Sequence, residues 1–261
     1  MPDNDDKNKT SGSKKHTYQA IRNCKIVKSN ELIQKSKYEL SAQEQKIIMY
    51  LISKVKPKDE AFITTEFDII EFCCVCGIDI KAGKNRKDII SAIKEVADRS
   101  IWVRLENNKI TTLRWIDKPV IDELTGMMQV KLDDLLKPFL LKLENNFTQF
   151  ELIYTLAMKS KYSIRLYEIL KSYEYKKSVM FSVGELKGLL NAANYNTYKD
   201  FRVRVLDAAV NEINDLSDLN VSYEAAKQGR GYSNVKFMIS LKLDLDERFA
   251  AWKKIQNVIG K

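Results

Sequence analysis

Few residues of this chain have the types and spacing that catalysis needs. The sequence of 261 residues holds a single histidine, His16. A serine or cysteine hydrolase usually needs a histidine base beside its nucleophile, and a zinc hydrolase usually needs two or three histidine ligands. Sites that hold a metal with paired histidines are excluded for the same reason. The sequence therefore predicts no catalytic site of these classes.

The cysteines also give little support for a metal site. They are Cys24, Cys73, Cys74 and Cys76. Thiolates bind zinc, but the crowded run from Cys73 to Cys76 differs from the separated ligand pairs of usual zinc sites, and no histidine lies near it. We interpret these cysteines as small apolar side chains at the end of a helix. We expect no metal, and no disulfide in a reducing compartment.

Nucleotide chemistry is equally poorly supported. The segment from Gly77 to Asn85 resembles a phosphate-binding loop, but five residues separate its glycines instead of four. Asn85 stands where a hydroxyl should bind Mg²⁺. The acidic pair Asp133-Asp134 fits better as the N-terminal cap of a following helix. We expect neither cofactor nor enzymatic activity, although a nuclease or strand transferase built on acids and a tyrosine stays open from composition alone.

The charge of the chain points to an anionic partner. Lysine and arginine number 44 against 35 acidic residues, which gives a formal net charge of +9. A positive field of this size favours nucleic acid or an acidic membrane surface. No apolar stretch approaches the ~20 residues of a membrane span. Residues 1–28 read as a disordered polar tail without a secretory signal, so we expect a cytoplasmic protein without membrane contact.

Two predicted helices combine an apolar face with basic residues. The first spans Lys84–Asp98, and its polar side suits a recognition helix in the DNA major groove. That side carries Lys84, Lys87, Ser91 and Lys94. The alternative is a solvated face with ion pairs four residues apart, such as Lys84–Asp88. We take the four residues as candidate DNA contacts placed by helix geometry alone.

The second basic helix is predicted over Tyr198–Asn214, with Thr197 as its N-cap. Its candidate DNA contacts are Tyr198, Lys199, Arg202 and Arg204. In a regular helix Arg202 lies roughly 200° from Arg204 and near the border of the core. Arg204 is therefore the better candidate for a base contact, because the guanidinium fork matches O6 and N7 of guanine.

A predicted β-hairpin follows each basic helix. Strands at Ile101–Leu105 and Ile110–Ile116 flank a tight turn that ends at Lys109. Strands at Val221–Ala225 and Val235–Leu241 flank a glycine-rich turn. That turn carries Lys227, Arg230 and Tyr232. Glycine with basic residues and an aromatic is typical of a loop that touches phosphates or a minor groove. An ordinary exposed loop is the alternative.

The elements that position these residues occur twice in the same order. A capped amphipathic helix, a short strand, two more helices and a hairpin form each series, and matching landmarks lie 117 to 119 residues apart. In the first series the strand is expected at Phe62–Thr64 and the next helix at Thr65–Cys74. This order is that of a winged helix. We predict a mainly helical α+β fold of two tandem winged-helix domains related by a pseudo-repeat. Their expected bounds are 29–146 and 147–243, followed by a C-terminal helix over 244–261.

Several segments, in order, resemble the initiator Rep proteins of theta-replicating, iteron-bearing plasmids. The run Ser160-Lys-Tyr-Ser-Ile-Arg-Leu-Tyr-Glu-Ile-Leu is similar to the signature helix of that family. Segments that begin at Tyr198, Asn211, Ser217 and Lys227 resemble the stretch from its recognition helix to its wing. The resemblance covers about Asn30 to Lys242, most of the chain.

The resemblance implies a function in plasmid DNA replication. Members of the family bind direct repeats of double-stranded DNA at the origin, help open adjacent duplex, and recruit a host helicase or initiator protein. Dimers often repress their own gene. By this likeness Arg202 and Arg204 would read bases, whereas Lys227 and Arg230 would hold the DNA backbone. The first domain would dimerise and add DNA contacts, and no enzymatic activity, polymerase activity included, is implied. The rival hypothesis is a plain winged-helix transcription repressor that binds one inverted site.

Overall fold

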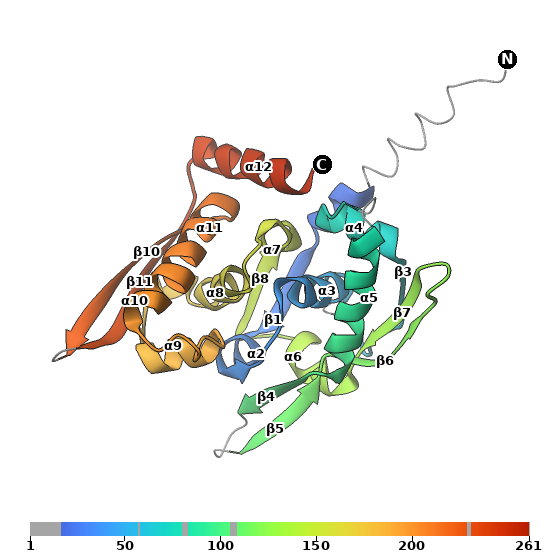
Figure 1. The fold of residues 1–261 in the computed structure, drawn as a ribbon, viewed down its shortest axis with the longest axis horizontal. Helices are drawn as coiled ribbons and strands as arrows, with labels where there is room; N and C mark the ends of the chain where they lie inside the picture. The colour runs from blue at the N-terminus through green and yellow to red at the C-terminus, as the bar shows by residue number, and fades with distance from the viewer. Residues whose placement is uncertain (1–16, 57, 80–82, 105–108, 229–230, 261) are drawn as a thin grey trace.

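The computed structural model of the protein describes residues 17–56, 58–79, 83–104, 109–228 and 231–260. Two similar series of helices and strands lie side by side, and a last helix lies across one end of the molecule (Figure 1). The helices and strands of the first series are β1 Lys25–Ser29, α2 Asn30–Lys35, β2 Ser36–Lys37, α3 Ala42–Ser53, β3 Thr65–Asp68, α4 Ile69–Cys76, α5 Gly83–Asp98, β4 Ser100–Arg104, β5 Ile110–Arg114, β6 Ile116–Ile121, β7 Met127–Leu132 and α6 Lys137–Leu140.

The second series ends in a long hairpin and the C-terminal helix. Its elements are β8 Phe147–Glu151, α7 Leu152–Ala157, α8 Lys161–Ser172, β9 Ser178–Ser182, α9 Val183–Leu189, α10 Tyr198–Phe201, α11 Ala208–Leu216, β10 Leu219–Gln228, β11 Gly231–Leu241 and α12 Leu245–Ile259. A π-helical turn, Arg202–Asp207, joins α10 to α11 and is called the π-turn below. The predicted α+β fold of two winged-helix domains is confirmed.

Each half carries an antiparallel three-stranded sheet that includes its hairpin. The first sheet has the order β2-β4-β5, and the second has the order β10-β11-β9. In the second sheet Phe237 of β11 lies opposite Tyr223 of β10 and Val179 of β9. The hairpin of the second half is therefore backed by the short strand that precedes α9.

The pseudo-repeat is imperfect at the equivalent place in the first half. The short strand β3 pairs with β7, and β6, β7 and β3 form a separate sheet. This strand lies at Thr65–Asp68, three residues beyond its expected position, and α4 begins only at Ile69. The physical reason is Asp68, whose side chain accepts hydrogen bonds from the backbone N–H groups of Ile70 and Glu71 and caps the helix. A helix beginning at Thr65 was thus a wrong prediction.

Side-chain caps fix the starts of the principal helices in both halves. The Oγ of Ser41 accepts a hydrogen bond from the N–H of Glu44 at 3.2 Å, and the Glu44 carboxylate accepts one from the N–H of Ser41 at 2.5 Å. This reciprocal pair is the predicted capping box of α3. Ser160 and Thr197 likewise accept from backbone N–H groups at the starts of α8 and α10.

The two halves are joined through residues that were expected to lie in a tail. From Thr17 the chain is helical, and β1 pairs antiparallel with β8 of the second half. Ile26 and Lys28 of β1 are buried. The disordered tail predicted over 1–28 therefore does not extend through residues 17–28. Sequence reasoning missed this strand because its partner lies far along the chain.

A polar network crosses the same junction. The Nζ of Lys28 lies 2.5 Å from a carboxylate oxygen of Glu168 on α8, and the two side chains are 2% and 0% exposed. Arg165 of α8 donates hydrogen bonds to the carbonyl oxygens of Ile33 and Ser36 at 2.7 and 2.9 Å. Because these groups are buried and paired, the network constrains how the two halves pack.

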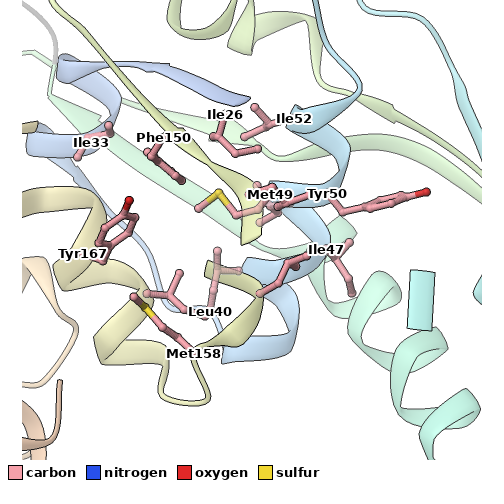
Figure 2. Packing of buried hydrophobic residues seen from close by; sticks show 14 of the residues in the cluster. Ile26, Ile33, Leu40, Ile47, Met49, Tyr50, Ile52, Phe150, Met158 and Tyr167 are labelled. Carbon is pink, nitrogen blue, oxygen red and sulfur yellow. The ribbon is translucent and has the colours of Figure 1, made fainter. Parts of the chain in front are cut away.

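Apolar side chains from both halves form one continuous core. Figure 2 shows Ile26, Leu40 and Met49 of the first half close to Phe150 and Tyr167 of the second. The ring centroids of Phe150 and Tyr167 lie 5.4 Å apart in an edge-to-face arrangement. The core and the polar network together hold the two winged helices in one arrangement.

The C-terminal helix α12 packs against α7 and α11, with Ile255 and Ile259 buried. Phe249 and Trp252 of the same helix are 53% and 48% exposed. The Arg22 side chain donates to the carbonyl oxygen of Ile259 at 2.6 Å and so ties the end of α12 to the start of the described chain. None of the described helices has the length and apolar character that crossing a membrane requires.

Candidate nucleic-acid interface

The predicted recognition helix of the second half is not one continuous helix. The Oγ1 of Thr197 accepts a hydrogen bond from the N–H of Asp200 at 3.0 Å and starts α10 as predicted. After Phe201 the chain passes into the π-turn before α11 begins at Ala208. A π-turn pairs residues five apart instead of four, so it accommodates one extra residue and is frequent at functional sites.

This turn moves Arg202 away from its expected place. In a regular helix Arg202 would lie near the border of the core, but its side chain is 49% exposed. Val203 and Arg204, the next two residues, are exposed as well. The prediction that Arg202 borders the core was therefore wrong, and the reason is the extra residue in the turn. Both arginines face solvent on the same short segment.

Asp207, at the end of the π-turn, links it to the hairpin. Its carboxylate lies 3.6 Å from the Nε of Arg202 and accepts a hydrogen bond from the hydroxyl of Tyr223 on β10. Burial and the hydrogen bond to Asp207 raise the pKa of Tyr223, so its phenol remains the donor at neutral pH. The guanidinium of Arg202 is thus oriented by a carboxylate that the sheet holds in place.

An aromatic pair makes a second link between helix and hairpin. The ring of Tyr198 stacks on that of Tyr232 of β11, with centroids 4.2 Å apart and planes 25° apart. The Nζ of Lys227 lies 5.4 Å from the centroid of the Tyr232 ring. Tyr198, which we had expected to contact DNA, is half-buried in this stack, whereas Lys199 and Lys227 are exposed. Arg230 lies outside the described residues.

The structure brings these second-half candidates together. Lys199, Arg202 and Arg204 lie on the helix, and Lys227 lies on the hairpin that both links hold against it. Figure 1 shows α10 beside the β10–β11 hairpin, which Tyr198 reaches through its stack on Tyr232. The result is an exposed cationic surface that carries two arginines and two lysines.

In the first half, the candidates on α5 are also exposed. Lys84, Lys87, Ser91 and Lys94 all lie on its solvent side. Lys94 pairs with Glu123 at 2.8 Å, and the pair expected between Lys84 and Asp88 is not among the ion pairs of the described residues. Ser91 hydrogen-bonds to Glu95 at 3.2 Å. Lys109 is exposed and directly precedes β5.

Sequence reasoning missed Arg86, which fixes α5 to the turn between β6 and β7. Its guanidinium donates to the carbonyl oxygens of Glu123 and Leu124, at 3.0 Å each.

In the second half, sequence reasoning missed the exposure of Val203 and the role of Asp207. The strand-like alternation Arg202-Val203-Arg204-Val205 inside a helical stretch was the available signal, because such a conflict of periods often marks a functional or strained site.

No metal-binding cluster accompanies these surfaces in the described residues. No group of three or more His, Cys, Asp or Glu side chains there is placed to hold a metal ion. Burial raises the pKa of the Cys73 thiol to about 11 and that of Cys76 to about 12. Both cysteines therefore remain protonated thiols that pack at the end of α4, as we interpreted them.

Comparison with known proteins gives consistent matches in sequence and fold. Residues 25–171 match the family model "Initiator Replication protein, WH1", and residues 182–239 match "Initiator Rep protein, WH2". A replication initiation protein of Escherichia coli is 23% identical over 233 residues, which cover 85% of this chain and 71% of that protein. The fold is similar to that in the crystal structure of Pi initiator protein in complex with iteron DNA. The TM-score is 0.71 at 20% identity, and the match covers 85% of this chain and 99% of that one.

The first family model alone spans more than half of the chain, and the second adds the sheet and recognition segment of the other half. The family expected from the sequence motifs is confirmed by these matches. The chain belongs to the replication initiator proteins that are built from two winged-helix domains, WH1 and WH2.

Proposed function

We propose that this replication initiator binds direct repeats of double-stranded DNA at a plasmid origin, with the second winged helix as its main reader of sequence. The observation that supports this most is the joint exposure of Arg202 and Arg204 on a turn held against its hairpin. The related Pi initiator was crystallised with iteron DNA, which supports the same class of ligand here.

The proposed role of each cation in DNA binding follows from the chemistry of its side chain. Arginine offers a rigid fork for O6 and N7 of guanine, so Arg202 and Arg204 are assigned to bases. Lys199 and Lys227 are point charges at the edges of the surface and are assigned to phosphates. The exposed lysines of α5 add counterion release, which strengthens binding to any sequence.

We propose duplex opening, recruitment of host proteins and autorepression because the chain belongs to the replication initiator family. Several copies bound to tandem repeats would supply the free energy that opens adjacent duplex, and host replication proteins would join this assembly in the cytoplasm. A dimer of the chain would repress its own gene. In this proposal the protein acts by binding alone and cuts no strand.

Footprinting on the DNA around the gene of this protein tests the proposal. We expect protection of several evenly spaced direct repeats, about two helical turns each. Protection of a single palindrome would favour a plain repressor, and no protection at low salt would reject DNA binding. Nicking of supercoiled DNA in the presence of Mg²⁺ or Mn²⁺ would contradict a function by binding alone.

A matched pair of variants tests the assigned surface. Arg204→Ala should lose protection of the repeats, whereas Lys253→Ala should keep it. Both remove one exposed positive charge, but Lys253 lies on α12, outside the proposed surface. Equal losses in the two variants would mean that only net charge matters.

A further inference from the structure

An exposed apolar side chain lies between the two arginines of the cationic surface. Val203 is 49% exposed, whereas Val205, two residues along, is 0% exposed. Single exposed apolar residues are common on proteins and need no explanation by themselves. Val203 differs because an exposed arginine flanks it on each side, in a segment that we propose to face DNA bases.

The π-turn is what allows three consecutive residues to face outward. Successive residues of an α-helix are about 100° apart, so in a regular helix with the register of the buried Val205 and Ala209, Arg202 would point toward the core. Here Phe201 before the three and Val205 after them are both 0% exposed. The extra residue of the π-turn rotates the preceding helix relative to the following one, so that Arg202 and Val203 join Arg204 on one face.

The position of this face is fixed from both ends. On one side Asp207 orients Arg202 and accepts the hydrogen bond of Tyr223. On the other side Tyr198 stacks on Tyr232. Because both links lead to the same hairpin, Val203 is held at a defined place on the surface.

We propose that Val203 contacts the C5-methyl group of one thymine in the major groove, beside a guanine read by Arg202 or Arg204. This inference rests on the proposed function. Among the bases, only thymine presents a methyl group in the major groove, and an apolar side chain recognises it by contact. The turn would thus read a thymine next to guanine, with one apolar and two charged side chains.

Replacement of thymine by deoxyuridine gives a direct test, since it removes only that methyl group. The full chain first selects its preferred sites from randomised duplexes, and each thymine of the selected site is then replaced singly. Wild-type protein should bind about fourfold more weakly when one particular thymine is replaced, as expected for one buried methyl group.

Val203→Ala should bind the all-thymine site about fourfold more weakly and should become indifferent at that one position. Val203→Ile should keep the sensitivity. As a control, Val120→Ala changes another exposed valine, on β6, and should leave the pattern of wild type unchanged.

The outcomes distinguish failure of the proposed function from failure of the role assigned to Val203. If no sequence is selected, the proposed function fails and this inference fails with it. If a sequence is selected but it lacks thymine, or wild type and Val203→Ala respond alike at every thymine, only the assignment of Val203 is overturned. Loss of sensitivity at one thymine in Val203→Ala alone supports it.

Discussion

The two basic helices of this chain resemble each other in sequence but differ in how they hold their charges. On α5, Lys94 is paired with Glu123 and Arg86 is bound to two carbonyl oxygens of the same turn. In the second half, the π-turn leaves Arg202 and Arg204 exposed, with Arg202 oriented by Asp207. A count of basic residues would rank α5, which has four, above the segment from Tyr198 to Leu216, which has three. We therefore propose that α5 contacts phosphates and that the π-turn contacts bases.

The sheets explain part of this difference. In the second half β9 pairs with the hairpin. The hairpin in turn contacts the π-turn through Tyr223 and α10 through Tyr232. In the first half β3 instead joins β6 and β7, whose turn reaches α5 and occupies two of its cations. The additional hairpin thus engages charges that the second half leaves on its recognition candidates.

The largest effect is expected at the junction between the two halves, where Lys28 of β1 pairs with Glu168 of α8. Glu168→Gln leaves Lys28 buried without its anionic partner, so that the amine must either stay charged or lose its proton, which should lower the free energy of unfolding by about 3–5 kcal/mol. Trp115, whose ring centroid lies 5.6 Å from the Nζ of Lys28, makes tryptophan fluorescence during urea denaturation a suitable measurement. The control Glu31→Gln removes the exposed pair with Lys35 and should cost at most about 1 kcal/mol. Equal costs would show that the junction is not coupled to global stability.

The stability of this variant should also depend on pH. Burial lowers the pKa of Lys28 and Glu168 opposes that effect, so the glutamine variant favours the neutral amine in the folded state. The unfolded chain then binds more protons than the folded one below the ordinary lysine pKa of about 10.4, so stability rises with pH. Urea denaturation at pH 7 and at about pH 9 should show a smaller cost of Glu168→Gln at the higher pH. A cost that grows with pH would contradict this reasoning.

The next largest effect separates base contacts from phosphate contacts. Arg204→Ala should cost about 1–3 kcal/mol of specific binding and relax the preference at one base pair. Lys87→Ala on α5 should weaken binding to all sequences alike and reduce the salt slope by about 1. Fluorescence anisotropy titrations at several salt concentrations, with the selected and a scrambled site, measure both quantities. The comparison fails if Lys87→Ala changes base preference and Arg204→Ala does not.

A smaller effect should come from the link between the hairpin and Arg202. Tyr223→Phe removes the hydroxyl that donates to Asp207 and should cost about 1 kcal/mol of binding, because Arg202 loses part of its orientation. In an Arg202→Ala background the same change should have little further effect on binding. This double-mutant cycle is measured as the free energy of binding to the selected DNA site. Additive losses would mean that Tyr223 acts independently of Arg202.

Local signals predicted the parts of the fold that depend on near neighbours. Ser41 and Thr197 cap helices where the sequence indicated, because a cap and its partners lie within four residues. The pairing of β1 with β8 joins residues more than a hundred positions apart, so no local pattern revealed it. The π-turn at Arg202 was missed for a related reason, since burial of both Phe201 and Val205 decides its register and that depends on the whole core.

The smallest effect is expected from a change at Glu123. It should make α5 more like the π-turn, because Lys94 would lose its acidic partner. Glu123→Gln removes the carboxylate that engages Lys94 at 2.8 Å, and both side chains are more than half exposed. Folding stability should therefore change by less than about 1 kcal/mol, since exposed pairs contribute little. Binding to any DNA sequence should become tighter, and the salt slope should rise by up to about 1, because Lys94 is released and a negative charge near the phosphates is lost. A Glu66→Gln control changes an exposed acid of β3 that bonds to Gln129 instead of a lysine. If the two variants bind equally, the pair with Glu123 does not restrain α5, and the weaker role assigned to this helix needs another cause.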